Sequence, residues 1–401
     1  MANSLLTIDM ITREALRVLA NKLVVTRNVD RQYDSSFAKE GAKIGSTLRI
    51  RKPDRVLVTD GAALVVQEEN QQWTTLTVSS QKHIGVAFSS AEQVMSLDDY
   101  SKIILEPRIS QLAATIDADV ATGVIKYIAQ SVGTPGTTPA TSLVLLNGQQ
   151  KLNEAAAPDM MRYCTVNPAA NAALVEGMKG FFNPSGTISR QFKTGMMGEG
   201  VLGYDEIAMS QSIGSFTTGS RVAATTSSAV TTEGATTIAL TISGGTATDT
   251  IKAGDVFTIA NCYAVNPQTR VTTGSLYQFV VLADATASGS AVTVTVAPMY
   301  SAAHALATVD ALPANSKTVT FVGSASTAYP QNLIYQQDAI TFATADLVLP
   351  DNTQASRAVH DGISLRVVKD YDIINDRQIC RLDVLYGYGV IRPELAVRLW
   401  G

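Results

Sequence analysis

Two stretches near the N-terminal end alternate between apolar and polar residues. The first follows Thr47, where Leu48 and Ile50 alternate with arginines, and the second is Trp73–Val78. Because successive side chains of a strand point to opposite faces, a period of two predicts half-buried strands. Pro53-Asp54 interrupts the first stretch, so an irregular connection is expected between the strands.

Together these strands predict an extended β-arm over residues 45–90, with Asp60-Gly61 supplying a turn. A hairpin of this length has little core of its own, and an isolated hairpin is marginal in water. We therefore expect the arm to lie on another surface, and a neighbouring subunit is the natural candidate.

Apolar residues spaced three and four apart predict two helices in the first third of the chain. One covers Thr7–Lys22. The other begins at Asp98-Asp99, whose acids complement the helix dipole, and continues to Ile128, about 30 residues or ~45 Å. Pro107 near its beginning is placed to kink it. The apolar faces are Met10, Ile11, Ala15 and Leu19 in the first helix, and Ile109, Leu112, Ala113, Ile116, Val120 and Val124 in the second.

Helices and short strands alternate over the next part of the chain. A helix is expected around Gln149–Ala157, a buried strand at Tyr163–Val166, and a helix from Asn167-Pro168 to about Lys179. Proline suits the first helical position because its missing N–H would have no intrahelical partner there. The alternation predicts a mixed α/β domain.

Composition changes sharply between about Thr217 and Ser326. Thr, Ala, Ser, Val and Gly dominate this segment, which holds only nine charged residues. Its β-branched runs, separated by glycine-containing turns, predict a small all-β barrel or sandwich. Mixed character returns afterwards, so we interpret the segment as a module inserted into a host domain. The runs are Thr236–Thr241, Asp255–Ile259, Tyr277–Val281 and Ala291–Val296.

Four further strands are predicted after the module. Asn375-Asp376 joins the last two as a hairpin. Arg392-Pro393-Glu394 then predicts a turn before an apolar tail that ends at Trp400. The four strands are Leu333–Tyr335, Ala339–Phe342, Ile363–Val368 and Gln378–Tyr388.

These elements predict an α+β fold of six consecutive segments. They are an N-terminal arm with a helix (1–44), the extended β-arm (45–90), a long spine helix with a peripheral domain (91–160), the first part of a central α/β domain (161–216), the inserted β-barrel or sandwich domain (217–328), and the second part of the central domain with a C-terminal β segment (329–401).

Charged residues make up 16% of the 401 residues, against ~25% in a typical soluble domain. Such a surface indicates extensive contact with other protein, although a secreted β-rich protein would show the same composition. The net charge of −4 favours neither nucleic acid nor an anionic membrane. Eleven Lys/Arg oppose six Asp/Glu through Arg55, which leaves −9 for the rest of the chain. This asymmetry suits head-to-tail contact between copies or, equally, a solvated amphipathic terminus.

Cysteine usage and the chain's apolar runs bear on its location. Cys164, Cys262 and Cys380 are odd in number and widely spaced, which argues against a disulfide framework or zinc site and fits a reducing compartment. Neither a secretory signal nor a stretch of ~18 apolar residues is evident. We therefore expect a soluble protein, intracellular at synthesis.

Motifs for chemistry are weak. Gly198–Gly203 matches GxGxxG, but a strand is expected after it, whereas a dinucleotide site needs a helix, so we interpret the glycines as a flexible turn. Asp117 and Asp119 lie two apart on a helix and do not share a face, which favours capping and solvation. No catalytic residue, metal or cofactor is expected. The three histidines, His83 in the arm, His304 in the module and His360 in a loop, are interpreted as surface or packing residues.

In its order of elements the chain resembles the major capsid proteins of tailed bacteriophages, which share the Hong Kong 97 fold. It looks most similar to the coat proteins of short-tailed Salmonella-type phages, which carry an inserted β-barrel domain. The residues that carry the resemblance are Leu48-Arg49-Ile50-Arg51-Lys52-Pro53, Asn183-Pro184, Gly203-Tyr204-Asp205-Glu206, Asp338-Ala339-Ile340, Cys380-Arg381-Leu382 and, above all, Leu385-Tyr386-Gly387-Tyr388-Gly389-Val390-Ile391-Arg392-Pro393-Glu394.

The resemblance implies a shell subunit that forms pentamers and hexamers, assembles with a scaffolding protein and a portal, and meets packaged DNA only non-specifically. Some members of the fold form Lys–Asn crosslinks, and Lys52 and Asn70 are the nearest such pair in the arm. Arg392 and Glu394 are expected to pair within or between subunits. The candidate subunit contacts are Arg49, Arg51, Lys52, Trp73, Arg392 and Glu394.

Two other functions remain open on the sequence alone. A tail tube or decoration protein would share the Thr-rich β module, although a long helix is rarely needed there. A nucleotide-binding α/β enzyme would use the loop at Gly198 and would lose nucleotide binding on replacement of Gly200.

Overall fold

The structure, a computed structural model, describes residues 8–31, 45–62, 64, 66, 71–89, 105–178, 195, 197–243, 248–351, 353–374 and 377–401. The chain forms two compact units, each assembled from separate stretches of sequence. Unit 1 consists of Met1–Ile50, Thr74–Val120 and Ile340–Ile391, and unit 2 of Arg51–Trp73, Ala121–Ala339 and Arg392–Gly401.

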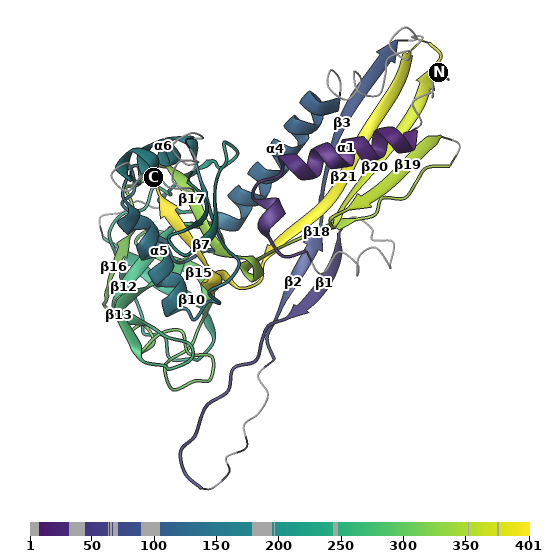
Figure 1. The fold of residues 1–401 in the computed structure, drawn as a ribbon. Coiled ribbons are helices and arrows are strands. Elements are labelled where there is room, and N and C mark those ends of the chain that lie inside the picture. Colours follow the sequence, from purple (N-terminus) through teal and green to yellow (C-terminus); the bar gives the residue numbers. More distant parts are fainter. Residues whose placement is uncertain are drawn as a thin grey trace. The chain divides into compact units, whose positions relative to one another are not determined.

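A five-stranded antiparallel sheet organises unit 1, and its longest strand, β21, pairs with β3, β18 and β20 (Figure 1). The predicted strand Gln378–Tyr388 therefore lies within β21, the strand with which three others of this sheet pair. Asn375-Asp376, predicted as its hairpin turn, lies outside the described residues. The strands are β3 (Ser80–Ser89), β18 (Ile340–Ala345), β19 (Gln354–His360), β20 (Ile363–Asp372) and β21 (Arg377–Val390).

Helix α1 (Ile8–Lys22) packs across β19 and β20, as Figure 1 shows. The predicted apolar face is confirmed for Ile11, Ala15 and Leu19, which are buried, but Met10 is exposed. Because the buried stripe is wider than a single row, it also takes in Thr12, Leu16 and Val18.

The spine helix α4 (Glu106–Ile125) buries every residue of its predicted apolar face, and it ends at Ile125 instead of the predicted Ile128. After Ile125 the chain tightens into i→i+3 bonds, with Ile128 N donating to Ile125 O. Pro107 is the second residue of the helix, where its missing N–H costs no intrahelical bond. Asp98-Asp99 lies outside the described residues.

The predicted arm strands form a two-stranded sheet of β1 (Ser46–Arg51) and β2 (Trp73–Val78). The next strand, β3, pairs with β21 instead, so the range 45–90 predicted for the arm contains a strand of another sheet. In unit 1 the arm strands pack against β18 and β21 through an apolar cluster of Ile50, Leu76, Val78, Ala343, Ala345, Leu385 and Ile391.

Close packing against β2 explains why a glycine stands at position 387 of β21. A Cβ built there would lie 2.3 Å from the carbonyl oxygen of Thr77, so β2 crosses β21 at a distance that only glycine permits. Gly389, two residues along, has Leu76 Cδ1 at 3.4 Å as its nearest neighbour and no backbone against it.

A seven-stranded mixed sheet organises unit 2, in the order β4-β22-β17-β5-β7-β6, with β8 also pairing β17. The predicted apolar tail forms β22, a fully buried strand inside this sheet, because β17 and β4 cover its two edges. The strands are β4 (Ser131–Val132), β5 (Arg162–Val166), β6 (Gly198–Val201), β7 (Tyr204–Met209), β8 (Ser215–Thr217), β17 (Ala328–Gln336) and β22 (Ala396–Trp400).

The observed bounds of two helices in unit 2 agree with the predicted bounds to different degrees. Helix α6 (Pro168–Gly177) begins as predicted, with the Asn167 side chain accepting from Ala170 N at 2.6 Å. Helix α5 (Ser142–Glu154) begins seven residues before the predicted start at Gln149 and ends before Ala157. Ala156 has a positive φ of 56°, which stops the helix.

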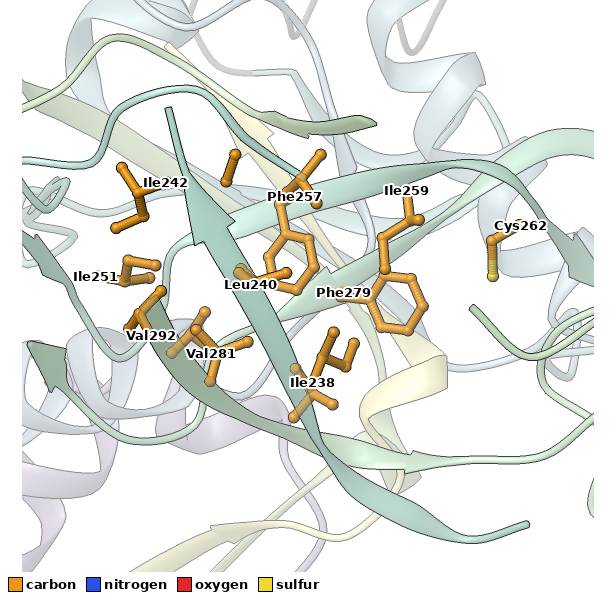
Figure 2. Close-up of a cluster of buried hydrophobic side chains, with 14 of the residues drawn as sticks. Ile238, Leu240, Ile242, Ile251, Phe257, Ile259, Cys262, Phe279, Val281 and Val292 are labelled. Atoms are coloured by element: carbon orange, nitrogen blue, oxygen red, sulfur yellow. The ribbon is translucent and has the colours of Figure 1, made fainter. Parts of the chain in front are cut away.

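The segment predicted as an inserted β module contains a six-stranded sheet in the order β13-β12-β16-β9-β10-β15. Its two end strands approach each other where Leu282 N donates to Thr295 O at 2.8 Å, so the sheet curls toward a barrel. Alternate apolar residues fill its interior, among them Leu240, Phe257 and Phe279 (Figure 2). The strands are β9 (Ala224–Thr226), β10 (Ala235–Ile242), β12 (Val256–Val265), β13 (Thr272–Val280), β15 (Ala291–Met299) and β16 (Thr318–Phe321), with the short pair β11 (Thr250–Ile251) and β14 (Ala285–Thr286) beside them.

Arg398 of β22 joins the module to the rest of unit 2. Its fully buried guanidinium donates from Nε to Ile125 O at 2.8 Å and from Nη2 to Gly254 O at 2.5 Å. The rings of Phe216 and Trp400 lie 5.3 and 5.6 Å from it. Burial lowers the pKa of Arg398 to about 9, so the group remains charged at neutral pH.

Arg398→Met keeps an apolar side chain beside Phe216 and Trp400 but removes the donors to Ile125 O and Gly254 O. An unpaired buried polar group costs about 1–3 kcal/mol, and loss of the buried charge offsets part of this. We expect the free energy of unfolding to fall by about 2–4 kcal/mol in urea titrations. Arg357→Met, at a half-exposed ion pair, should cost less than about 1 kcal/mol. Equal effects would contradict the role given to Arg398.

Gly387→Ala is expected to destabilise unit 1 because its Cβ meets the backbone of β2, and overpacking of this kind costs about 1–3 kcal/mol. Gly389→Ala is the matched control and should change the urea midpoint much less. If the Gly387→Ala variant were as stable as the control, the contact between β2 and β21 would not require glycine at this position.

Candidate subunit-contact site

The structure brings three of the predicted contact residues together in unit 2. Glu394 Oε1 lies 3.3 Å from Arg55 Nη2 and 3.4 Å from Arg392 Nε. The predicted pairing of Arg392 with Glu394 is thus present within the chain. The lining of the pocket beside them includes Lys52. The sequence shows Arg55 only as part of the basic N-terminal region. Its pairing with Glu394 could not be predicted, because the two residues lie far apart in the chain.

This pocket has a volume of about 240 Å³ and is lined only by residues of unit 2. Besides the charged residues, its walls include three tyrosines: Tyr127, Tyr277 and Tyr300. On one side Lys151 Nζ bonds to Glu154 Oε2 at 3.2 Å, so these two charges neutralise each other.

The arm segment that borders the pocket is held to the β module. Gln72 Nε2 donates to Tyr300 Oη at 3.2 Å, and Arg270 Nη2 donates to Val56 O at 2.8 Å. Lys52 N donates to Gln72 O at 2.8 Å, which extends the pairing of the arm by one bond beyond β1 and β2. These bonds fix the base of the arm against one wall of the pocket.

Lys52 is the least compensated charge of the group. Burial lowers the pKa of Lys52, the carboxylate of Glu394 opposes that shift, and Arg55 and Arg392 add to it. Among the described residues, the Lys52 ammonium forms no hydrogen bond or ion pair. Three cations therefore share the single carboxylate of Glu394.

The other predicted contact residues lie on the arm strands. Arg49 and Arg51 are exposed on β1, and Trp73 begins β2 with 57% of its surface exposed. They do not line the pocket. Asn70, named with Lys52 as the nearest crosslinking pair, lies outside the described residues.

Beyond the arm strands the chain exposes apolar side chains. Val56, Val58, Leu64 and Val66 are 63–91% exposed on backbone that forms no strand. In the isolated chain these residues leave apolar area in contact with water. We call these four residues the arm patch.

The glycine motif is a β-hairpin. β6 and β7 pair antiparallel across Leu202 and Gly203, whose φ values are 54° and 77°. Two consecutive positive φ values are typical of the tight turn that suits a two-residue hairpin. A strand, β7, follows the glycines, as predicted, at the position where a dinucleotide site would need a helix.

Asp117 was expected to be solvated or to cap a helix, but the structure buries it. Its buried carboxylate accepts hydrogen bonds from Val24 N at 2.7 Å, Thr26 N at 3.1 Å and the Thr26 hydroxyl. Burial raises the pKa of Asp117, and these bonds oppose the rise. Asp119 faces elsewhere and accepts from Tyr386 Oη at 2.5 Å, in agreement with the prediction that the two acids do not cooperate.

The three histidines and three cysteines lie in strands, in a local turn or in the buried core. His83 and His360 are in strands β3 and β19 rather than in the arm and a loop, and His304 Nδ1 accepts from Leu306 N at 3.1 Å. Burial raises the pKa of Cys164 and Cys262 to about 12 and that of Cys380 to about 11, which keeps the thiols protonated.

No cluster of three or more His, Cys, Asp or Glu in the described parts of the chain is arranged to hold a metal ion. No helix within them combines the length and apolar character needed to cross a membrane.

Among the described residues, Glu394 is the carboxylate that raises the Lys52 pKa, so we expect Glu394→Gln to lower that pKa further. At a fixed pH near neutrality a larger fraction of the amine is then uncharged. Its acetylation, followed by mass spectrometry, should accelerate. Glu154→Gln removes a carboxylate that pairs with Lys151 and should leave Lys52 nearly unchanged. Equal acceleration in both variants would contradict the assignment.

Comparison with solved structures returns phage structures of low sequence identity. A Mycobacterium phage Che8 structure matches with a TM-score of 0.46 and 12% identity, over 94% of this chain and 90% of that one. The capsid of cyanophage P-SCSP1u matches with a TM-score of 0.42 and 11% identity, over 90% and 84%. The I-domain of the CUS-3 coat protein is 25% identical, with a TM-score of 0.20, over 25% of this chain and 95% of that one.

The family comparison covers the complete sequence. No curated protein matches the chain significantly. The family model described as "P22 coat protein - gene protein 5" matches residues 1–401. The mixed α+β architecture agrees with the fold class expected from the sequence. The chain therefore belongs to the P22 coat protein family and is a bacteriophage major capsid protein.

Proposed function

We propose that copies of this chain assemble into the icosahedral head shell that encloses phage DNA, as pentamers and hexamers joined by repeated contacts. The observation that carries this proposal is the arm patch, with Val58 91% and Leu64 89% exposed. Exposed apolar residues on an arm without a core of its own gain stability only by covering another surface. In a shell of identical copies that surface belongs to a neighbour.

The arm is suited to reach a neighbour because its base is held firmly. Within unit 2, Arg270 anchors Val56 O, while Gln72 bonds to Tyr300. A held base lowers the conformational entropy that the patch loses on docking. Association is then driven by burial of the apolar patch, at roughly 25 cal/mol per Å² of apolar surface.

Further partners follow from the family resemblance. A scaffolding protein and a portal are proposed as assembly partners, and packaged DNA as a non-specific contact. The overall charge of −4 agrees with the absence of a strong general attraction to nucleic acid. We propose synthesis in the cytoplasm of the bacterial host and residence in the virion capsid.

We also propose that the protein has no enzymatic activity of its own. The hairpin at Gly198–Val201 and Tyr204–Met209 gives the nucleotide-binding alternative no support, because a phosphate site there would need a helix N-terminus. A tail tube or decoration protein is not favoured either, since the matched family is that of a coat protein.

Electron microscopy of the expressed chain, alone and with its scaffolding protein, tests the assembly proposal. We expect uniform closed particles in at least one condition. A chain that stays a monomer or dimer throughout would contradict the proposal.

Val58→Asp tests the arm patch separately. A charge on a surface that becomes buried should prevent docking, so particle yield is expected to fall at least ~10-fold while the thermal midpoint of the free subunit stays the same. Val348→Asp is the matched control, because Val348 is 76% exposed and lies outside the arm. Normal particles from Val58→Asp would exclude the arm patch as an essential contact.

A further inference from the structure

The pocket beside Glu394 has a net positive charge in the isolated chain. Of the six charged side chains that line it, Lys151 and Glu154 pair with each other. The other four are three cations and the carboxylate of Glu394, which leaves a net charge of +2. Arg55 and Arg392 bind Glu394, and Lys52 is the cation without a bonded partner among the described residues.

Burial makes this imbalance costly. Lys52 is half-buried, and Arg55 and Arg392 keep less than a third of their side-chain surface in water. Water therefore compensates these cations only in part. The lowered pKa of Lys52 has the same cause, since burial and the two guanidinium groups both disfavour its charged form. One additional carboxylate beside Lys52 would relieve both effects.

The shape of the pocket limits what can supply that carboxylate. A volume of about 240 Å³ is below the ~300–1,000 Å³ of sites for drug-sized ligands and leaves room for one carboxylate side chain to enter. Its walls include aromatic and aliphatic groups, such as Tyr277, Leu276 and Pro267, which would pack against a methylene stem. Glu394 and Glu154 in the same lining disfavour a polyanion, so a single carboxylate fits better than a nucleic-acid backbone.

We propose that this pocket receives one Asp or Glu side chain from a second copy of the chain, and that the incoming carboxylate pairs with Lys52. The proposal rests on the proposed function, because a shell repeatedly brings a second copy alongside the first. Charge complementarity identifies the occupant. Lys52 and Arg55 belong to the basic N-terminal region, whereas the chain beyond Arg55 has a net charge of −9.

The proposed contact would act with the arm patch. The pocket lies at the base of the arm, where Lys52 N bonds to Gln72 O and Gln72 in turn bonds to Tyr300. A carboxylate held there neutralises the base of the arm, while the patch covers apolar surface further along it. Since a buried charge pair needs a matching geometry, the pocket adds register to an otherwise non-directional apolar contact.

A zero-length crosslink identifies the partner of Lys52 directly. Particles are assembled from an equal mixture of unlabelled and ¹⁵N-labelled chain and treated with a carbodiimide, which joins an amine to an adjacent carboxylate as an amide. Mass spectrometry of the digested particles then locates each crosslink. Isotope-mixed peptide pairs reveal links between copies. The free subunit, treated in the same way, gives the links within one copy.

An isotope-mixed crosslink from Lys52 to an Asp or Glu, present in particles and absent from free subunits, is the expected result. Crosslinks from Lys52 only to Glu394 or Glu154 of the same copy would overturn the proposal. A crosslink to a carboxylate of a different protein would overturn it as well, because the occupant would not be a second copy. Failure to form particles contradicts the proposed function itself, whereas particles without the link between copies contradict only the pocket.

Substitution gives an independent measurement. Lys52→Gln removes the charge and should raise the protein concentration needed for assembly at least ~10-fold, as expected when one partner of a buried charge pair is lost. Lys126→Gln is the matched control, because Lys126 is exposed in unit 2 and does not line the pocket. Equal assembly by the two variants, with equal thermal midpoints of the free subunits, would overturn the proposal.

Discussion

Unit 2 depends on one buried cation, the guanidinium of Arg398. This guanidinium bonds to the carbonyl at the end of α4 and to Gly254 of the β module, and it belongs to β22, an interior strand of the mixed sheet. A positive charge at a helix C-terminus also interacts favourably with the helix dipole. Within the module, Arg221 and Asp255 form a buried ion pair at 3.2 Å. The carboxylate of Asp255 also interacts electrostatically with Arg398, so the module is joined to its host through charge as well as through packing. Buried charges of this kind tolerate little misalignment, and they therefore favour a single docking geometry.

The same interleaving of distant segments builds the pocket. Lys52 and Arg55 come from the base of the arm, Tyr277 and Tyr300 from the β module, and Glu394 from the turn before β22. The first and the last of these segments are more than three hundred positions apart in the chain, yet all of them surround one small volume. The use that we propose for this charged pocket is a contact between copies of the coat protein.

Local rules account for much of the secondary structure. The period-two pattern placed β1 and β2 because both strands keep one face on the apolar cluster around Leu76 and Leu385. The three-four pattern from Ile109 to Val124 placed the buried face of α4, and Asn167-Pro168 placed the start of α6. The change of composition after Thr217 predicted a β module, and alternate residues of its strands fill the interior of that module (Figure 2). In each case the side chains that decide the element lie within a few positions of one another.

The sequence by itself determined the order of these elements, the α+β class and a resemblance to phage coat proteins. Only the tertiary structure decided that the C-terminal tail is an interior strand of a sheet, that Asp117 is a buried acceptor for Thr26, and that Lys52 shares a pocket with Glu394. The physical reason is the same for all three. Periodicity reports which side of an element avoids water, whereas the partner of a buried charge or the neighbour of a strand is set by residues far away in the chain.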